Sequence, residues 1–193
     1  MITFNGVDLS TYFSVQEIRG RGIVQYDTSM IEVAAIDGAY IEGRRRPVRT
    51  IEVDVIISAD NHEELREKID VINGILHADE PVPIVFSDEP GRVYYGVVSD
   101  TLETTEFISL YKGTITFLCP DPYKYGDEVI VEFTSDTAIV ENPGTAPSEP
   151  VFELTATKQT TFAMVTNGEQ YMAIGRPEDA IDVPASDREV VLN

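Results

Sequence analysis

The chain has 193 residues, of which 42% are hydrophobic, and its 34 acidic residues against 14 Lys and Arg give a net charge of −20. This length suits one large domain or two small ones, and the composition excludes an intrinsically disordered chain. A surface this acidic repels phosphate backbones, which disfavours a nucleic-acid-binding role. Solubility is the simpler explanation of the charge, and lining a passage through which nucleic acid slides is the rarer one.

Cysteine content and the amino terminus restrict the class of protein further. Cys119 is the only cysteine, so the sequence predicts neither an internal disulfide nor a zinc or CxxC site. The start, MITFNGVDLS, lacks the regions of a secretory signal peptide, and no apolar run approaches the roughly 20 residues that a membrane span needs. We therefore expect synthesis in a reducing compartment and no membrane anchor.

The first part of the chain predicts strands, turns and then one helix. In residues 48–57 apolar side chains alternate with polar ones, which favours a strand with one buried face. Residues 60–76 predict a helix, because Asp60 and Glu63 have capping-box spacing and apolar residues recur at helical intervals. Two ion pairs are expected on the exposed side of this helix: Glu64 with Lys68, and Arg66 with Asp70.

The remainder predicts strands interrupted by a linker. Residues 82–86, 92–100 and 107–119 read as strands, with Cys119 on the same side as Phe117. Further strands are predicted at 128–133 and 150–157, separated by the Pro- and Gly-rich segment ENPGTAPSEP. A hairpin is expected around Asn167-Gly168, in which a two-residue turn sets Met164 opposite Tyr171.

The predicted elements give an α+β fold that is mostly β, organised in two modules. We assign residues 1–133 to an amino-terminal module with one helix, 134–150 to a linker region and 151–193 to the start of an all-β module. That second module is too short for a self-sufficient sandwich, which usually needs about seven strands and 100 residues. It is expected to be a partial domain or to be completed by neighbouring subunits.

The sequence contains few residues or motifs suited to catalysis. Cys119 would need a base, but His62 and His77 lie at the two ends of the predicted helix, some 20 Å apart. The motifs GxGxxG, GxSxG, HExxH and the P-loop are absent, and DNHEE lacks the glycine of a calcium loop. We therefore expect no catalytic residues, no metal and no cofactor, and a protein that acts through its surface.

Two short segments are candidates for that surface. Arg44, Arg45, Arg46 and Arg49 hold four of the chain's 14 basic residues, in a predicted turn between strands. Guanidinium groups suit interfacial carboxylates, so this cluster is interpreted as a contact with the acidic surface of another subunit, and nucleic-acid contact is the less favoured alternative. In FLCPDPYKYG the prolines end the preceding strand and stiffen the chain, which predicts a joint between modules formed by Pro120, Asp121, Pro122, Tyr123 and Tyr125.

The order of these segments resembles the distal tail protein family of long-tailed bacteriophages. The resemblance covers Met1 to about Phe133 and continues through the linker into VTNGEQYMAIGRP. Its most specific pieces are the F-N-G start, the D-E-P-G-R-x-Y-Y-G segment and the C-P-D-P-Y close.

The resemblance implies a structural hub at the virion tail tip. It implies a homo-hexameric ring, single or stacked, built from β-sandwich or split-barrel-like amino-terminal modules, with galectin-like modules facing outward. Its partners would be the tail tube protein, the tail-associated lysin or fibre and the receptor-binding proteins, with the tape measure and DNA passing through a central channel. The rival reading, from the residues alone, is a carbohydrate-binding adhesin that acts through exposed aromatic side chains such as Tyr171.

Overall fold

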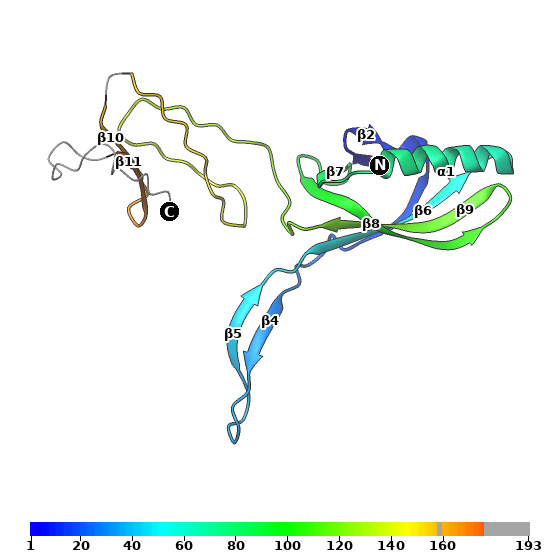
Figure 1. The fold of residues 1–193 in the computed structure, drawn as a ribbon, viewed down its shortest axis with the longest axis horizontal. Helices are drawn as coiled ribbons and strands as arrows, with labels where there is room; N and C mark the ends of the chain where they lie inside the picture. Colours follow the sequence, from blue (N-terminus) through cyan, green and yellow to red (C-terminus); the bar gives the residue numbers. More distant parts are fainter. Residues whose placement is uncertain (158–159, 176–193) are drawn as a thin grey trace. The chain divides into compact units, whose positions relative to one another are not determined.

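The structure, a computed structural model, describes residues 1–157 and 160–175, and the chain divides into two compact units, Met1–Val140 and Glu141–Asn193 (Figure 1). The first unit contains a seven-stranded sheet in the order β2-β1-β7-β8-β9-β6-β3, in which all neighbouring strands are antiparallel. Its strands are β1 (Ile2–Phe4), β2 (Val7–Asp8), β3 (Ser14–Arg19), β6 (Arg49–Ser58), β7 (Val82–Phe86), β8 (Val93–Glu106) and β9 (Leu110–Cys119). A short 3-10 helix, Leu9–Thr11, follows β2.

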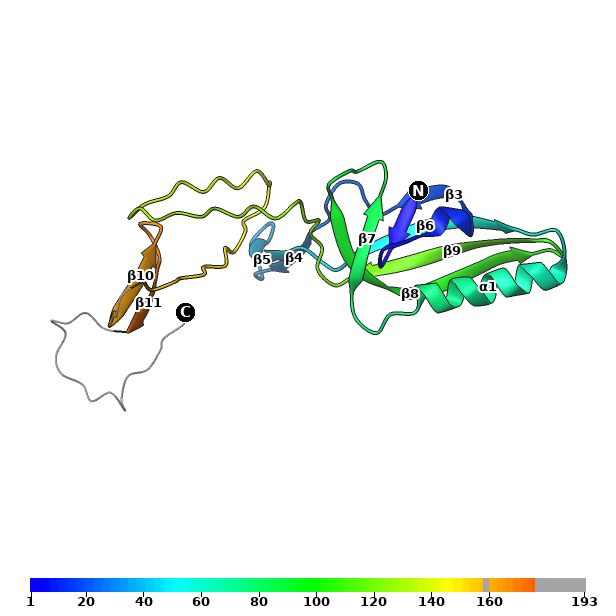
Figure 2. The same cartoon turned by 90° about the horizontal axis from the view of Figure 1, so that it is seen from above.

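Strand β8 joins the two halves of this sheet. Its first residues pair with β7, and from Val97 onward it pairs with β9. Figure 2 shows β1 and β7 running across the direction of β6 and β9, so the sheet wraps into an open β-sandwich-like fold. Gly96 stands where β8 changes partner, and a Cβ there would lie only 2.8 Å from the Leu118 carbonyl oxygen and 2.9 Å from the Cys119 sulfur. The close approach of β8 to β9 therefore requires glycine.

The core fills the space enclosed by this sheet and the helix. The alternation predicted for β6 is confirmed, because the apolar residues at every second position from Ile51 to Ile57 are at most 4% exposed. Cys119 is buried on the same side as Phe117, as predicted. The other buried members come from β1, the 3-10 helix and the residues after it, β7, β8, β9 and α1: Ile2, Phe4, Leu9, Phe13, Leu65, Ile72, Leu76, Ile84, Phe86, Tyr94 and Ile115.

Helix α1 spans His62–Leu76 and lies along one face of the sheet in Figure 1. The predicted capping box is displaced by one residue: the Asn61 side chain accepts from the Glu64 backbone N–H at 3.0 Å, and the Glu64 carboxylate accepts from the Asp60 N–H at 2.8 Å. Of the two predicted ion pairs, Glu64–Lys68 is present at 2.8 Å. The other prediction is wrong, because Arg66 pairs with Glu106 of β8.

Gly74 near the end of α1 gives a direct test of helix propensity. A Cβ at this position would meet no atom within 4 Å, and the residue is not in the left-handed region. Gly74→Ala is therefore expected to raise the free energy of unfolding by about 0.5–1 kcal/mol, measured by urea denaturation. Gly96→Ala, which lacks that space, should lower it. An unchanged or lowered value for Gly74→Ala would mean that the helix end is not helical in solution.

A two-stranded ribbon is inserted between β3 and β6, and we call residues 20–48 the arm. Its strands β4 (Asp27–Ile31) and β5 (Tyr40–Arg45) pair with each other and, among the described residues, with no other strand. Figure 1 shows the ribbon leaving the sheet where β3 ends and β6 begins. Every residue of both strands is exposed. A ribbon of two strands is marginally stable alone in water, so this one needs a covering surface.

The carboxy-terminal third contains fewer strands than predicted. Residues 128–133 and 150–157 form no strand, because an alternating pattern makes a strand only where a partner strand is available. The hairpin around Asn167 is present as β10 (Phe162–Thr166) and β11 (Tyr171–Gly175), but Met164 lies opposite Ala173. The predicted register is wrong by two residues, because the Asn167 side chain accepts from the Glu169 and Gln170 N–H groups and closes a four-residue loop.

The mostly β fold with a single helix is confirmed for the described residues. Residues 158–159 and 176–193 of the predicted second module lie outside them. The boundaries assigned from the sequence and the galectin-like character of that module stay predictions.

Candidate functional site at the root of the arm

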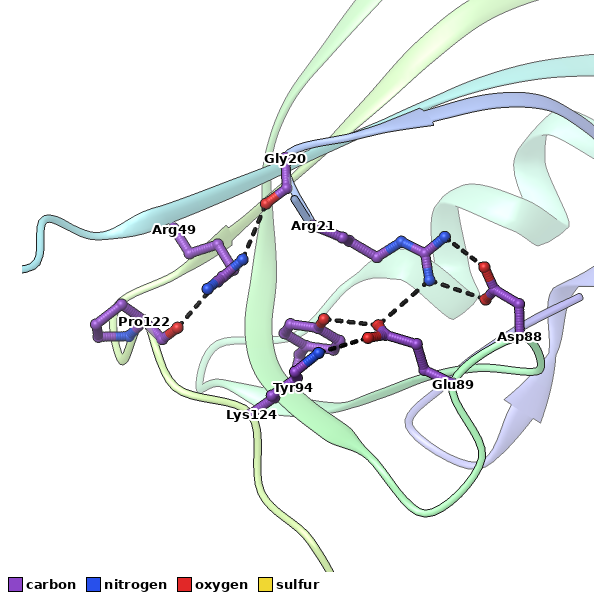
Figure 3. A network of polar contacts seen from close by, with 8 residues as sticks. All are labelled: Gly20, Arg21, Arg49, Asp88, Glu89, Tyr94, Pro122 and Lys124. Atoms are coloured by element: carbon purple, nitrogen blue, oxygen red, sulfur yellow. Dashed lines mark hydrogen bonds and ion pairs between the residues drawn. The ribbon is translucent and has the colours of Figure 1, made fainter. Parts of the chain in front are cut away.

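The root of the arm brings together the two segments singled out in the sequence. Arg49, the first residue of β6, donates from Nε to the Pro122 carbonyl oxygen at 2.9 Å and from Nη1 to the Gly20 carbonyl oxygen at 3.1 Å (Figure 3). Gly20 starts the arm and Pro122 belongs to the segment after β9. One guanidinium group thus ties the arm to the chain leaving the sheet.

The segment after β9 folds back along β8 instead of projecting from it. Tyr125 exchanges two backbone hydrogen bonds of 2.9 Å with Val93, and its ring meets that of Tyr95 edge-on at 5.7 Å between centroids. The Tyr125 hydroxyl donates to the Asp121 carboxylate, and this hydrogen bond raises the pKa of Tyr125 above its ordinary value. The same carboxylate accepts from the Tyr123 N–H at 3.0 Å. The Pro-Asp-Pro-Tyr segment is therefore a fixed turn.

Arg21 lies at the centre of a second set of contacts in Figure 3. Its side chain is only 17% exposed and donates to the Asp88 carboxylate at 2.7 and 2.8 Å, with Glu89 3.4 Å away. Its guanidinium carbon lies 4.3 Å from the centroid of the Phe86 ring. The hydrogen bonds from Arg21 hold the pKa of Asp88 below its ordinary value. The arm is thereby attached to the turn between β7 and β8.

Glu89 extends this network to the segment after β9. It accepts hydrogen bonds from the buried Tyr94 hydroxyl at 2.7 Å and from the Lys124 ammonium group at 2.5 Å. Burial acts to raise the pKa of Glu89, but the hydrogen bonds from Lys124 and Tyr94 outweigh it and the pKa is lowered. Burial, followed by the hydrogen bond to Glu89, raises the pKa of Tyr94. Four separate segments are thus held by charge-assisted hydrogen bonds.

Sequence reasoning missed Arg21, Asp88, Glu89 and Tyr94. Arg21 and Asp88 are 67 residues apart in the chain, so no local spacing connects them. The available signal was an arginine between two glycines, facing a D-E-P-G turn of opposite charge. Such a pairing becomes specific only when the sheet topology is known.

The four arginines predicted as one contact cluster have different environments. Arg49 is held inside the unit as described above, and Arg45, 83% exposed, makes a 3.6 Å ion pair with Asp27. Arg44 stacks on the Tyr26 ring at 3.8 Å from its centroid. Arg46 lies 4.7 Å from the centroid of Tyr123 and 5.7 Å from that of Tyr26. Arg44 and Arg45 end a strand and are not part of a turn, because β5 continues to Arg45.

Cys119 and the two histidines, the residues considered for catalysis, lie at a buried position of β9 and at the two ends of α1. Cys119 is fully buried, and burial raises the pKa of its thiol to about 11, so the thiol stays protonated and unreactive. His62 and His77 occupy opposite ends of α1, as expected. In this part of the chain no group of three or more His, Cys, Asp or Glu is placed to hold a metal ion. None of its helices is long and apolar enough to span a membrane.

Comparison with known proteins places this fold in a family. Residues 5–119 match the phage tail protein RIFT-related domain, a range that includes the arm, the helix and every strand of the sheet except β1. The chain is 41% identical over 160 residues to the distal tail protein of Bacillus phage SPP1, an alignment that covers 80% of this chain and 63% of the relative. The chain belongs to the distal tail protein family of bacteriophages.

A solved structure from the same family supports the fold. The crystal structure of SPP1 Dit, described as a paradigm of the hub adsorption apparatus in phages that infect Gram-positive bacteria, aligns with a TM-score of 0.63 and 41% identity. The alignment covers 66% of this chain and 52% of that chain. The present chain thus spans less than two thirds of the length of these relatives. The family resemblance inferred from the F-N-G, D-E-P-G-R and C-P-D-P-Y segments is confirmed.

Removing the Arg49 guanidinium tests whether it holds the segment after β9. Arg49→Ala deletes two hydrogen bonds from a charged donor, each contributing roughly 1–2 kcal/mol. Amide hydrogen exchange of residues 121 and 123–126, the non-proline residues of this segment, should accelerate about tenfold or more, because local opening becomes easier. Arg45→Ala, an exposed arginine outside this network, should leave the same amides unchanged. Equal protection in Arg49→Ala and the wild type would show that other contacts hold the segment.

Proposed function

We propose that the chain is a non-enzymatic structural hub of the phage tail tip. In this proposal it forms a homo-hexameric ring, single or stacked, that joins the tail tube protein to the tail-associated lysin or fibre and to the receptor-binding proteins. The observation that carries the proposal is the match of residues 5–119, which hold the arm, the helix and most of the sheet, to the phage tail domain, with 41% identity to a distal tail protein over 160 residues. The exposed ribbon of β4 and β5 pairs with no other described strand. Such a ribbon on a folded sheet suits a protein that functions by assembly.

The charge of the chain fits a central channel. With a net charge of −20, an acidic channel wall would repel the phosphates of DNA and let the tape measure and DNA pass without adhesion. The cluster at Arg44, Arg45 and Arg46 would then face neighbouring subunits, where the opposite charge is useful. Residues 120–125 would fix the direction in which the chain leaves the ring.

Imaging of the assembled phage particle by electron microscopy tests the proposal. The expected result is a closed ring of six copies at the distal end of the tail tube, with a predominantly acidic channel wall. A single copy per tail, or a position outside the tail, would overturn it. A neutral or basic wall in an otherwise correct ring would overturn only the proposed role of the charge.

Carbohydrate binding is the alternative, and it rests on exposed aromatic side chains, of which Tyr171 is the most exposed tyrosine among the described residues. Tyr171 on β11 is 73% exposed. Binding of glycans by the wild-type protein that is lost in Tyr171→Ala would favour this alternative over a purely structural role.

A further inference from the structure

The face of the arm that carries Arg44 has a set of cationic groups without acidic partners. The guanidinium carbon of Arg44 lies 3.8 Å from the centroid of the Tyr26 ring, and that of Arg46 lies 4.7 Å from the centroid of Tyr123 and 5.7 Å from that of Tyr26, so both guanidinium groups lie over aromatic rings. Arg46 donates one hydrogen bond from Nη2 to the Tyr26 hydroxyl at 3.5 Å, and the other N–H groups of the two arginines are left for an acceptor outside the ribbon. Within the described residues neither arginine forms an ion pair, although the chain has 34 acidic residues.

The same face continues into apolar side chains. Thr28 lies opposite Arg44 and, beyond a β-bulge that leaves one extra residue in β5, Met30 lies opposite Ile41, so alternation along β4 puts Met30 on the side of Thr28 and Arg44, with Ile41 as its partner. Met30 is 63% exposed and Ile41 is 68% exposed. A ribbon with a basic root and an exposed apolar continuation is an unfilled contact surface.

Helix α1 has a complementary stripe. Glu63, Glu67 and Asp70 are spaced by four and three residues, so they share one exposed side, and Val71, 48% exposed, follows Glu67 by one turn. Among the described residues none of these three carboxylates has a basic partner. The other charged side chains of the helix are used: Glu64 pairs with Lys68, and Arg66 pairs with Glu106.

The spacings of the two surfaces agree. Residues two apart in an extended chain are separated by about 6.6 Å, and residues four apart in a helix by about 6 Å along the axis. Two stacked guanidinium groups can therefore each meet one carboxylate of the helix, with the apolar continuation of the arm directed toward Val71. Arg45 cannot join them, because its ion pair with Asp27 places it on the other face of the ribbon.

We propose that the arm of one copy docks on α1 of a second copy, with Arg44 and Arg46 paired to Glu63 and Glu67. Because the two surfaces are different patches of the same chain, the contact is heterologous and can repeat around a closed ring. The proposal rests on the proposed function in that it requires copies of the chain to assemble. It adds the surfaces through which they do so.

Charge exchange in the full-length chain tests the contact. Self-association is measured by sedimentation velocity over a concentration series for Arg44→Glu/Arg46→Glu, for Glu63→Arg/Glu67→Arg and for an equimolar mixture of the two. Each double variant alone should self-associate at least about tenfold more weakly than the wild type. The mixture should recover association, because each reversed arm then finds a reversed helix. Arg45→Glu should weaken self-association much less. Glu128→Arg/Glu132→Arg makes the same change of net charge as the helix variant, but at a site outside α1, and is its control.

A cross-link makes the test independent of the strength of association. Arg44→Cys and Glu67→Cys proteins are mixed under oxidising conditions, where the buried Cys119 does not react. The expected product is the heterodimer, in excess over both homodimers and over the Arg45→Cys control. If no such excess forms, the proposed contact is wrong. Failure of both experiments while electron microscopy still shows a ring would reject this contact and leave the proposed function standing.

Discussion

Replacing Gly20 by alanine is expected to destabilise the first unit strongly. Gly20 has a φ of +91°, and a Cβ there would lie 1.9 Å from the Thr50 carbonyl oxygen, a backbone atom that cannot rotate away. The left-handed conformation alone costs a residue with a side chain roughly 1–2 kcal/mol, and displacement of β6 adds to it. We expect a loss of about 3 kcal/mol or more in the free energy of unfolding, measured by urea denaturation.

Two neighbouring glycines separate the causes of this effect. Gly22→Ala should change stability little, because it lies outside the left-handed region and has open space around its Cβ. Gly38→Ala has a φ of +90° but no atom within 4 Å, so it reports the conformational cost without the clash. If Gly20→Ala and Gly38→Ala lost the same stability, the close approach of the arm to Thr50 would not be important.

Gly20→Ala also tests the connection between the arm and the chain leaving the sheet. The Gly20 carbonyl oxygen accepts from Arg49, which also holds Pro122. A shift of Gly20 should therefore increase amide hydrogen exchange in residues 121 and 123–126 as well as in the arm. If exchange increased only in the arm, the hydrogen bond from Arg49 to the Pro122 carbonyl oxygen would not depend on Gly20.

Local patterns predicted the elements of the first unit better than they predicted contacts between them. The alternation in residues 48–57 and the helical spacing in 60–76 depend on neighbours in sequence, and both elements are present. The same alternation failed at 128–133, where no other described segment supplies a partner strand and Ile130 is 74% exposed. Arg66 pairs with Glu106 of β8 in preference to Asp70, a choice set by tertiary packing.

The candidate site shows the same division. The Pro-Asp-Pro-Tyr turn and the basic cluster were visible in the sequence, because each is contiguous. The contact between these two segments was not visible in the sequence, since Arg46 reaches Tyr123 only after β6 and β9 pair and bring both segments to one end of the sheet. Arg49 differs from the other three arginines because it donates to the carbonyl oxygens of Gly20 and Pro122, and the sequence does not show that these groups lie beside it.

Replacing Arg21 by alanine is expected to cost about 2–3 kcal/mol of stability at neutral pH. Breaking a buried ion pair typically costs roughly 3–5 kcal/mol, and the lower figure applies because the Asp88 side chain is 61% exposed. Loss of the side chain also uncovers the Phe86 ring on which it lies. Arg92→Ala, which removes an exposed arginine that forms no ion pair with the other described residues, should be nearly neutral.

The pH dependence of this loss identifies its electrostatic part. The pKa values of Asp88 and Glu89 are lowered in the folded protein from ordinary values of 3.8 and 4.5. Lowered carboxyl pKa values stabilise the fold above the unfolded values, and this stabilisation disappears as the pH falls through the folded values. The difference between wild type and Arg21→Ala should therefore be constant above about pH 5.5 and shrink in acid below about pH 4. A difference that stayed constant in acid would assign the whole effect to lost packing on Phe86, and the ion pairs at the root of the arm would then contribute no stability.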